Sequence, residues 1–161
     1  STNSLINDGI SGQGQITKQG TGKLTLLGSN DYSGGTTVSA GILEGNTTSL
    51  QGNITNNSQV LFTQNFNGSY SSIISGTGKL TKEGNGGTLR LGLSNAINTS
   101  SSVNIALAAT FDLNNFNQQT GSLSGSGNIT LGSGNLTIAQ LSNETFSGII
   151  SGTGSLTKIG N

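Results

Sequence analysis

The sequence predicts an all-β protein, a right-handed single-stranded parallel β-helix (β-solenoid) of roughly eight coils. Three observations support this fold class: a glycine-rich cassette recurs, short segments alternate between apolar and polar residues, and apolar positions return at about one coil length. At about 20 residues per coil and about 4.8 Å between stacked strands, the chain would form a rod about 40 Å long.

The recurring cassette consists of an apolar residue, a Ser-Gly-x-Gly turn and a short alternating segment. Copies at residues 10–18, 74–82 and 150–158 end in lysine, and a fourth, weaker copy at residues 123–131 ends in leucine. Self-similarity of this kind indicates that function depends on the length and surface of a rod rather than on a pocket.

The cassettes divide the chain into repeat cores at about residues 10–45, 70–95 and 123–161. Each coil of a solenoid is stabilised by its neighbours, so we interpret residues 1–161 as one β-helix segment of a longer domain. No signal peptide is expected at the start of the sequence. The sequence starts and stops within the repeat pattern, so the chain is expected to be a fragment of a longer secreted protein.

Short strands bounded by Gly, Asn or Ser are expected along the whole chain. In residues 23–26, for example, Leu24 and Leu26 share one face because side chains alternate with a period of two. The same pattern is expected in residues 37–40, 53–55, 59–62, 79–82, 88–91, 103–107, 110–113, 128–131, 135–138 and 155–158. Essentially no helix is predicted, and a short turn at residues 93–97 is the only candidate.

Many short strands would also fit a β-sandwich, but two features favour the β-helix. Inward positions recur 18 or 19 residues apart, at Leu24, Leu43, Leu61 and Leu80. Aromatic residues make up only 4% of the chain. A sandwich core about 10 Å thick is usually filled by large side chains, whereas a narrow β-helix core can be filled by stacked Leu, Ile, Val and Ala.

The composition argues against several classes of partner and site. The net charge is +0 and the six basic residues are scattered, whereas nucleic-acid binding requires clustered Lys and Arg. There is no basic amphipathic helix and no apolar run long enough to span a membrane. Cysteine is absent, which excludes disulfides, thiolate metal sites and cysteine nucleophiles.

Asparagine is abundant, and its main expected role is in turns, because it tolerates left-handed backbone conformations. In a solenoid, asparagines at the same position of successive coils can also stack as a hydrogen-bonded ladder. Residues 53–57 and 114–117 are the candidates for such ladders.

Residues 20–45 strongly resemble the autotransporter-associated β-strand repeat, the passenger-associated repeat of bacterial type V secreted proteins. The family pattern falls on Gly22, Leu24, Leu26, Gly28, Asn30, Tyr32, Gly34, Gly35, Thr36, Val38, Gly41 and Leu43. Residues 70–95 and 146–161 resemble the lead-in to the same repeat. The former lacks the Tyr-x-Gly-Gly-Thr turn after Asn95, so about half of the chain has clear repeat character.

This resemblance implies a passenger β-helix that is exported through an outer-membrane β-barrel and lies at the bacterial cell surface or is secreted. It implies that the repeats act as a scaffold and help to drive export by folding outside the cell. The implied partners are the remainder of the same passenger chain and its β-barrel, with a host cell surface or a second copy as further possibilities. Adhesion or toxicity of a passenger usually lies elsewhere, on loops or inserted domains.

Candidate catalytic groups are few, since the chain has no histidine. The carboxylates are Asp8, Asp31, Glu44, Glu83, Asp112 and Glu144. Asp8 and Asp31 could face each other on neighbouring coils, and paired carboxylates can cleave glycosides, but solvated turn positions are the expected role. No catalytic, cofactor-binding or metal-binding residue is predicted, no cofactor is implied, and the chain is expected not to be an enzyme.

Two further sequence patterns are candidates for binding sites. Lys82 and Glu83, beside Arg90, are expected to form a surface ion cluster of little energetic weight, with polysaccharide binding as a minor alternative. The Gly34-Gly and Gly86-Gly segments lack the aspartate of the calcium-binding nonapeptide, and the Gly-x-Gly turns do not open helices as phosphate loops do.

The leading hypothesis is a structural stalk that assists export by vectorial folding and displays adhesive or virulence modules. The first alternative is a direct adhesion or self-association surface, formed by flat polar faces with outward Thr25 and Ser39. A less favoured alternative is a polysaccharide-acting β-helix enzyme, which would depend on Asp8 and Asp31.

Overall fold

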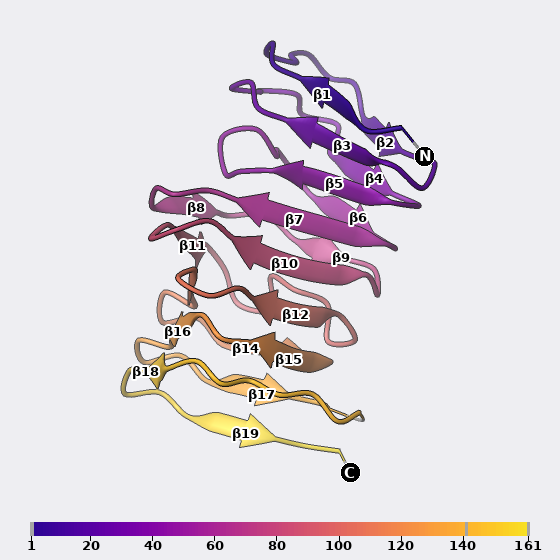
Figure 1. Cartoon of the computed structure of the whole chain (residues 1–161). Helices are drawn as coiled ribbons and strands as arrows, with labels where there is room; N and C mark the ends of the chain where they lie inside the picture. Colours follow the sequence, from indigo (N-terminus) through magenta and orange to yellow (C-terminus); the bar gives the residue numbers. More distant parts are fainter. Residues whose placement is uncertain (1, 141, 161) are drawn as a thin grey trace.

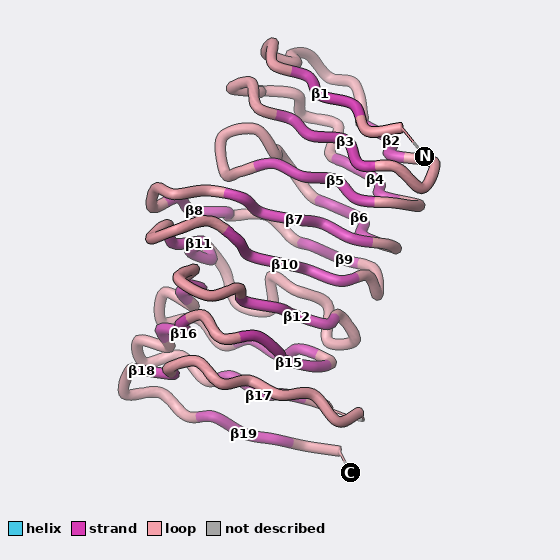
Figure 2. Tube along the Cα trace, viewed as in Figure 1, coloured by secondary structure: helices cyan, strands magenta, loops and turns pink. Residues whose placement is uncertain are grey.

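The computed structural model describes residues 2–140 and 142–160, and this part of the chain contains strands and turns but no helix (Figures 1 and 2). The strands pair in parallel and stack as a β-solenoid of about 8 turns, which confirms the predicted fold class. Residues 93–97 form a turn in which Asn95 has a φ of 52°. No described segment is a helix long and apolar enough to cross a membrane. The handedness stays a prediction.

The strands form three faces, named A, C and B in the order in which the chain visits them, and the coils that contain β1 to β6 have no strand on face C (Figure 1). Face A is a seven-stranded sheet of β1 (Ser4–Ile6), β3 (Lys23–Leu26), β5 (Ile42–Gly45), β7 (Gln59–Thr63), β10 (Lys79–Glu83), β12 (Ser102–Ile105) and β15 (Ser122–Gly125). Face C is a five-stranded sheet of β8 (Gly68–Tyr70), β11 (Thr88–Leu91), β13 (Thr110–Asp112), β16 (Asn128–Thr130) and β18 (Ile150–Ser151).

Face B consists of two shorter sheets that follow one another along the rod. The first contains β2 (Ile16–Lys18), β4 (Thr36–Val38), β6 (Ile54–Asn56) and β9 (Ile74–Ser75), and the second contains β14 (Gln118–Thr120), β17 (Leu136–Ile138) and β19 (Leu156–Lys158). A single parallel bridge between Ile74 and Ile97 continues the face past β9. The irregular coil around residues 93–101 therefore interrupts face B without breaking the stack.

The core is built from inward columns, in which one residue of each coil stacks on the equivalent residue of the next. On face A the main column is Leu24, Leu43, Val60, Leu80, Val103 and Leu123. The prediction that Leu61 belongs to this column is wrong, because Leu61 pairs with Glu44 and Thr81. Adjacent strand residues point to opposite faces, so the slip of one residue puts Val60 inward in its place.

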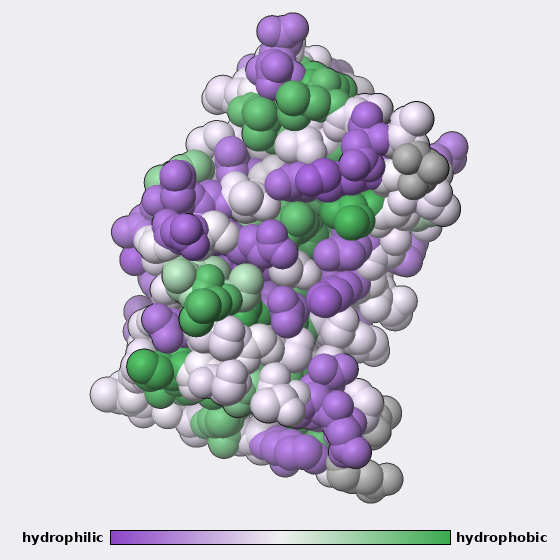
Figure 3. All heavy atoms as spheres, viewed as in Figure 1, coloured by the Kyte–Doolittle hydropathy of each residue, from purple (hydrophilic) through white to green (hydrophobic). Residues whose placement is uncertain are grey.

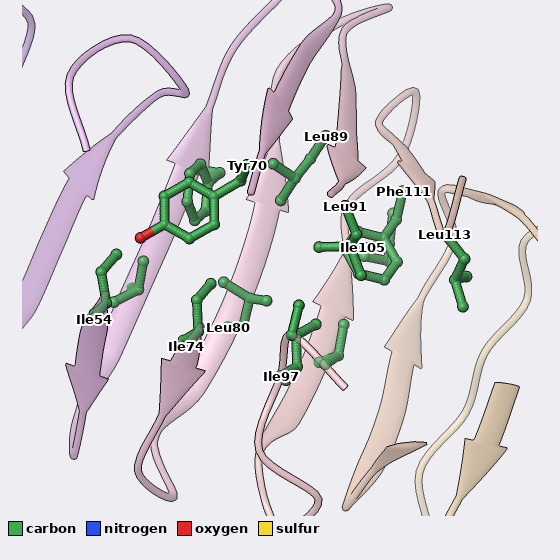
Figure 4. Packing of buried hydrophobic residues seen from close by; sticks show 14 of the residues in the cluster. Ile54, Tyr70, Ile74, Leu80, Leu89, Leu91, Ile97, Ile105, Phe111 and Leu113 are labelled. Atoms are coloured by element: carbon green, nitrogen blue, oxygen red, sulfur yellow. The ribbon is translucent and has the colours of Figure 1, made fainter. Parts of the chain in front are cut away.

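Face B supplies a second column, and Figure 4 shows Ile54, Ile74 and Ile97 pointing into the interior, with Leu80 of face A nearby. These isoleucines are at most 1% exposed. Aromatic rings also lie in the core, where Phe62 and Tyr70 meet edge to face with ring centroids 5.2 Å apart. The narrow interior is thus filled by stacked aliphatic side chains with few rings, as the low aromatic content predicts.

Candidate functional site

The repeat at residues 20–45 carries a buried asparagine that links three coils. Asn30 is 6% exposed; its Oδ1 accepts the backbone N–H of Ile10 at 2.7 Å, and its Nδ2 donates to the carbonyl of Ser49 at 2.6 Å. Ile10 lies 20 residues before Asn30 and Ser49 lies 19 residues after it, which is one coil in each direction. One amide side chain therefore satisfies backbone groups on both neighbouring coils.

The tyrosine of the repeat is also a link between coils. Tyr32 is 2% exposed, and its hydroxyl lies 3.0 Å from the Thr36 hydroxyl. The same hydroxyl accepts the backbone N–H of Gln51, 19 residues further on, at 3.1 Å. The signature polar residues of the repeat therefore face inward and bind backbone, and they do not present chemistry at the surface.

Two glycines of the repeat are required by the close stacking of coils. A Cβ added at Gly28 would lie 2.4 Å from the carbonyl oxygen of Asp8, and one added at Gly41 would lie 2.3 Å from that of Gly22. Gly41 also has a φ of 69°, in the left-handed region that side chains disfavour. Both positions are thus fixed by contact with the preceding coil.

The cassette forms a corner, which is the bend of the chain from one face of the rod to the next. Its four copies lie at all three corners of the coil, from face C to B, from B to A and from A to C. The copies at residues 10–18 and 150–158 lead the chain from the side of face C into face B, through β2 and β19 respectively. The copy at residues 74–82 runs from β9 on face B to β10 on face A, and the copy at residues 123–131 runs from β15 on face A to β16 on face C. The cassette therefore specifies how the chain bends between two strands and not a fixed place in the coil.

The expected surface cluster of Lys82, Glu83 and Arg90 does not exist. Lys82 is 0% exposed and points into the core, because it shares a strand face with buried Leu80. Arg90 instead pairs across face C with Asp112, at 2.8 Å between Nε and Oδ2. The period-two alternation of the strand places Lys82 on the same inward side as Leu80.

The two aspartates proposed as a glycosidase pair do not occupy matching positions. Asp8 and Asp31 are both exposed. The backbone of Asp8 lies against Gly28, whereas Asp31 donates its N–H to the carbonyl of Ile10 at 3.0 Å. The two carboxylates are therefore offset along the stacked segments, and nothing in their geometry favours a shared proton.

The remaining carboxylates lie on the outside of the rod. Glu44 bonds Lys23 at 2.6 Å and the Thr25 hydroxyl at 2.9 Å. Partial burial acts to raise the pKa of Glu44, but the bonds from Lys23 and Thr25 outweigh it and the net shift is downward. Glu83 and Glu144 are exposed. Within the described ranges, no group of three or more His, Cys, Asp or Glu could hold a metal ion.

The predicted asparagine ladders take the form of bonds from side chain to backbone. Asn53 Oδ1 accepts the N–H of Ile73, one coil later, at 3.0 Å. Asn117 Oδ1 accepts the N–H of Asn135 at 2.9 Å, and Asn135 Oδ1 in turn accepts that of Ser155 at 3.1 Å. Each asparagine thus holds the corner of the next coil, so the turn role and the ladder role coincide.

Three shallow, open hollows lie on the surface of the described residues. Polar and apolar residues are interspersed over the face shown in Figure 3. A hollow of about 430 Å³ lies at the first coils beside Lys18 and Lys23, and one of about 360 Å³ lies at the last coils beside Phe146 and Leu156. A third hollow, of about 490 Å³, is lined by small polar residues such as Ser100 and Ser122.

Comparison with known proteins gives matches to a passenger repeat and to an autotransporter adhesin. Residues 16–44 match the passenger-associated-transport-repeat family. The chain is 34% identical over 159 residues to the adhesin BmaC autotransporter of Brucella suis biovar 1 (strain 1330). The match covers 94% of this chain, but the chain spans only about 3% of the length of that adhesin. No solved structure matches the chain significantly.

Proposed function

On the premise that this chain carries the passenger repeat of autotransporters at residues 16–44, we propose that it is a structural scaffold segment of a passenger at the bacterial surface or secreted from the cell. Its work is to extend the rod, to help export by folding coil by coil, and to hold adhesive modules away from the cell. The proposed partners are the remainder of the passenger and its outer-membrane β-barrel.

The main support for this proposal is that the polar signature residues of the repeat point inward. Asn30 and Tyr32 are buried and bind backbone groups of neighbouring coils. A typical hydrogen bond of this kind stabilises a fold by about 1 kcal/mol, and a buried group left without its partner costs about 1–3 kcal/mol. Residues used in this way stabilise stacking, which is what a stalk requires.

The short sequence range of these cross-coil contacts supports the proposed assistance of export. The cross-coil bonds of Asn30 span 20 residues backward and 19 forward, so a coil that emerges can pair at once with the coil before it. In a solenoid each coil interacts only with its neighbours, and folding can propagate from one end without waiting for the rest of the chain. Folding outside the membrane would then oppose backsliding.

We propose that this segment has no enzymatic role. Asp8 and Asp31 are offset, and Asp112 is engaged with Arg90, so these carboxylates do not form an acid–base pair. A glycoside hydrolase requires two carboxyl groups that flank one bond. Absence of cleavage on a panel of glycans is the expected result, and cleavage that Asp31→Asn abolishes would contradict it.

The scaffold proposal is tested by fusing the chain to an outer-membrane β-barrel that lacks a passenger. Surface display is measured by protease accessibility on whole cells, and stability by urea unfolding of the isolated chain. Asn30→Ala should lower both, whereas the matched control Ser39→Ala, at an exposed position, should change neither. Loss of stability with normal display would refute the export role, and unchanged stability would refute the scaffold role of the signature.

A self-association surface is the second candidate, and a column of hydroxyl groups on face B favours it. Thr17, Thr37, Thr55 and Ser75 stack in register on four successive coils. Thr25 on face A donates its hydroxyl to Glu44 and lies outside this column. Sedimentation should show association that Thr37→Lys abolishes, and a chain that stays monomeric at high concentration would exclude this role.

A further inference from the structure

Two cassette lysines point into the core instead of into solvent. Lys18 ends β2 on face B and is 6% exposed, and Lys82 lies in β10 on face A and is 0% exposed. Each is followed two residues later by a glycine in the left-handed region, Gly20 with a φ of 70° and Gly84 with a φ of 106°. The same Lys-x-Gly corner therefore folds an amine inward on two different faces.

The Lys18 corner suits a charged ammonium group. Nζ of this residue donates at 2.9, 2.6 and 2.9 Å to the carbonyl oxygens of Gln19, Gly20 and Ala40. An ammonium group has three N–H donors, and each one has an acceptor here. Ala40 lies on the following coil, so the bond to it also links two coils.

The Lys82 corner offers fewer acceptors. Nζ of Lys82 donates to the carbonyl oxygen of Gln64 at 3.0 Å and to that of Glu83 in a shorter bond. In its column Lys82 stacks between Phe62 and Ile105, both of which are buried. Two carbonyls match the two N–H donors of a neutral amine, whereas an ammonium group would direct a third donor at apolar neighbours.

Few charges act on this amine. The strands paired with β10 are β7 and β12, and neither contains a charged residue. On β10 itself Lys79 and Glu83 are exposed, and on face C Arg90 and Asp112 pair with each other. The other titratable group at this part of the core is the phenol of Tyr70, whose ring contacts Phe62.

We propose that Lys82 is a pH-sensitive latch in the middle of the rod, whose neutral amine completes the two-carbonyl corner and whose protonation loosens the stacking of β7, β10 and β12. The Lys18 corner is the matched counterpart, since its amine has three carbonyl acceptors instead of two. The inference concerns the fold alone and does not depend on the proposed function.

The expected pH dependence follows from the burial of Lys82. Burial lowers the pKa of Lys82 from 10.5 to about 8, and the nearby charge of Glu83 opposes part of this shift. Between these two values the unfolded chain binds more protons than the folded chain, so stability rises as the pH increases. From pH 7 to pH 9.5 the unfolding equilibrium constant should fall about 25-fold.

The experiment is urea unfolding of the full chain at several pH values from 7 to 9.5, for the wild type, Lys82→Met and Lys18→Met. The wild type and Lys18→Met should both show the fall in the unfolding constant, and Lys82→Met should show a flat profile. A fall of the same size in Lys82→Met would overturn the proposal. So would a flat profile in the wild type.

A second measurement keeps the proposal testable if a variant does not fold. In the wild-type chain, NMR of lysine labelled at Cε follows the titration of each amine. The Lys82 signal should titrate near pH 8, well below the ordinary lysine value of 10.5. Titration of Lys82 at that ordinary value would show that the amine leaves the core, and would overturn the proposal.

Discussion

Tyr32 and Tyr70 hold the same turn from its two sides. The hydroxyl of Tyr32 accepts the backbone N–H of Gln51, and the hydroxyl of Tyr70 donates to the carbonyl of the next residue, Gly52. Gln51 lies one coil after Tyr32, and Tyr70 lies 18 residues after Gly52. The turn between β5 and β6, which contains no strand of its own, is thereby fixed to the coils on either side.

Replacing either tyrosine by phenylalanine removes one of these bonds and keeps the ring. We expect Tyr32→Phe and Tyr70→Phe each to lower the free energy of unfolding by about 1–2 kcal/mol, because a backbone group loses its partner. Urea unfolding measures this change. Amide exchange at Gln51 should accelerate in Tyr32→Phe and much less in Tyr70→Phe, and equal protection in both variants would contradict the assignment of the bonds.

The chain should lose stability at high pH through Tyr70. Burial raises the pKa of Tyr70 far above its ordinary value of 10.0, with a smaller contribution from Tyr32. This stabilisation is fully present below pH 10 and is lost as the pH rises further, because only the unfolded phenol ionises readily. Absorbance near 295 nm should therefore show that Tyr70 ionises together with unfolding, and Tyr70→Phe should remove its contribution to that step.

The register of β7 predicts different effects for neighbouring residues. Val60 is 0% exposed and lies in the inward column, whereas Leu61 lies on the opposite side of the strand. Val60→Asp should place an unpaired charge in the central core and cost several kcal/mol or prevent folding, and Leu61→Asp, at a position 7% exposed outside the central cluster, should cost less. Thermal unfolding compares the two variants, and the reverse order would contradict the register.

Glycines of the corners should differ sharply in their tolerance of a side chain. Gly41→Ala should cost more than about 2 kcal/mol, because the φ of 69° is unfavourable and the new Cβ would meet the Gly22 carbonyl. Gly14→Ala is the matched control, since a Cβ there would meet nothing within 4 Å. Its effect on the unfolding free energy should lie within about 0.5 kcal/mol.

The fold class and most apolar strands follow from the alternating pattern, and the polar strands do not. In β14 the inward residues are Gln118 and Thr120, so the segment shows no hydrophobic alternation although both are buried. Gln118 donates to the Leu93 carbonyl, a contact between residues 25 positions apart. Such contacts depend on the length of each coil, which the local sequence does not reveal.

The candidate site was predictable only in part. The repeat signature identifies Asn30 and Tyr32, but their bonds to neighbouring coils require the stacking register. The spacing of 18 or 19 residues suggests Leu61 as a core residue because the step from Leu43 to its true successor, Val60, is shorter. The surface position expected for Lys82 is wrong because Lys82 shares the inward side of its strand with Leu80.

The use of one cassette at all three corners has a consequence for how such genes can change length. Successive copies begin at residues 10, 74, 123 and 150, so neighbouring copies differ by a number of whole turns plus one corner. Recombination between neighbouring copies would delete that extra corner and rotate every later residue onto a different face. Exchange between the copies at residues 10 and 150, which lie at the same corner, would instead preserve the angular phase. Sequence similarity between cassettes would therefore permit exchanges that do not conserve the angular position of the coil. Only exchanges between copies at the same corner of the rod leave the remaining coils in register.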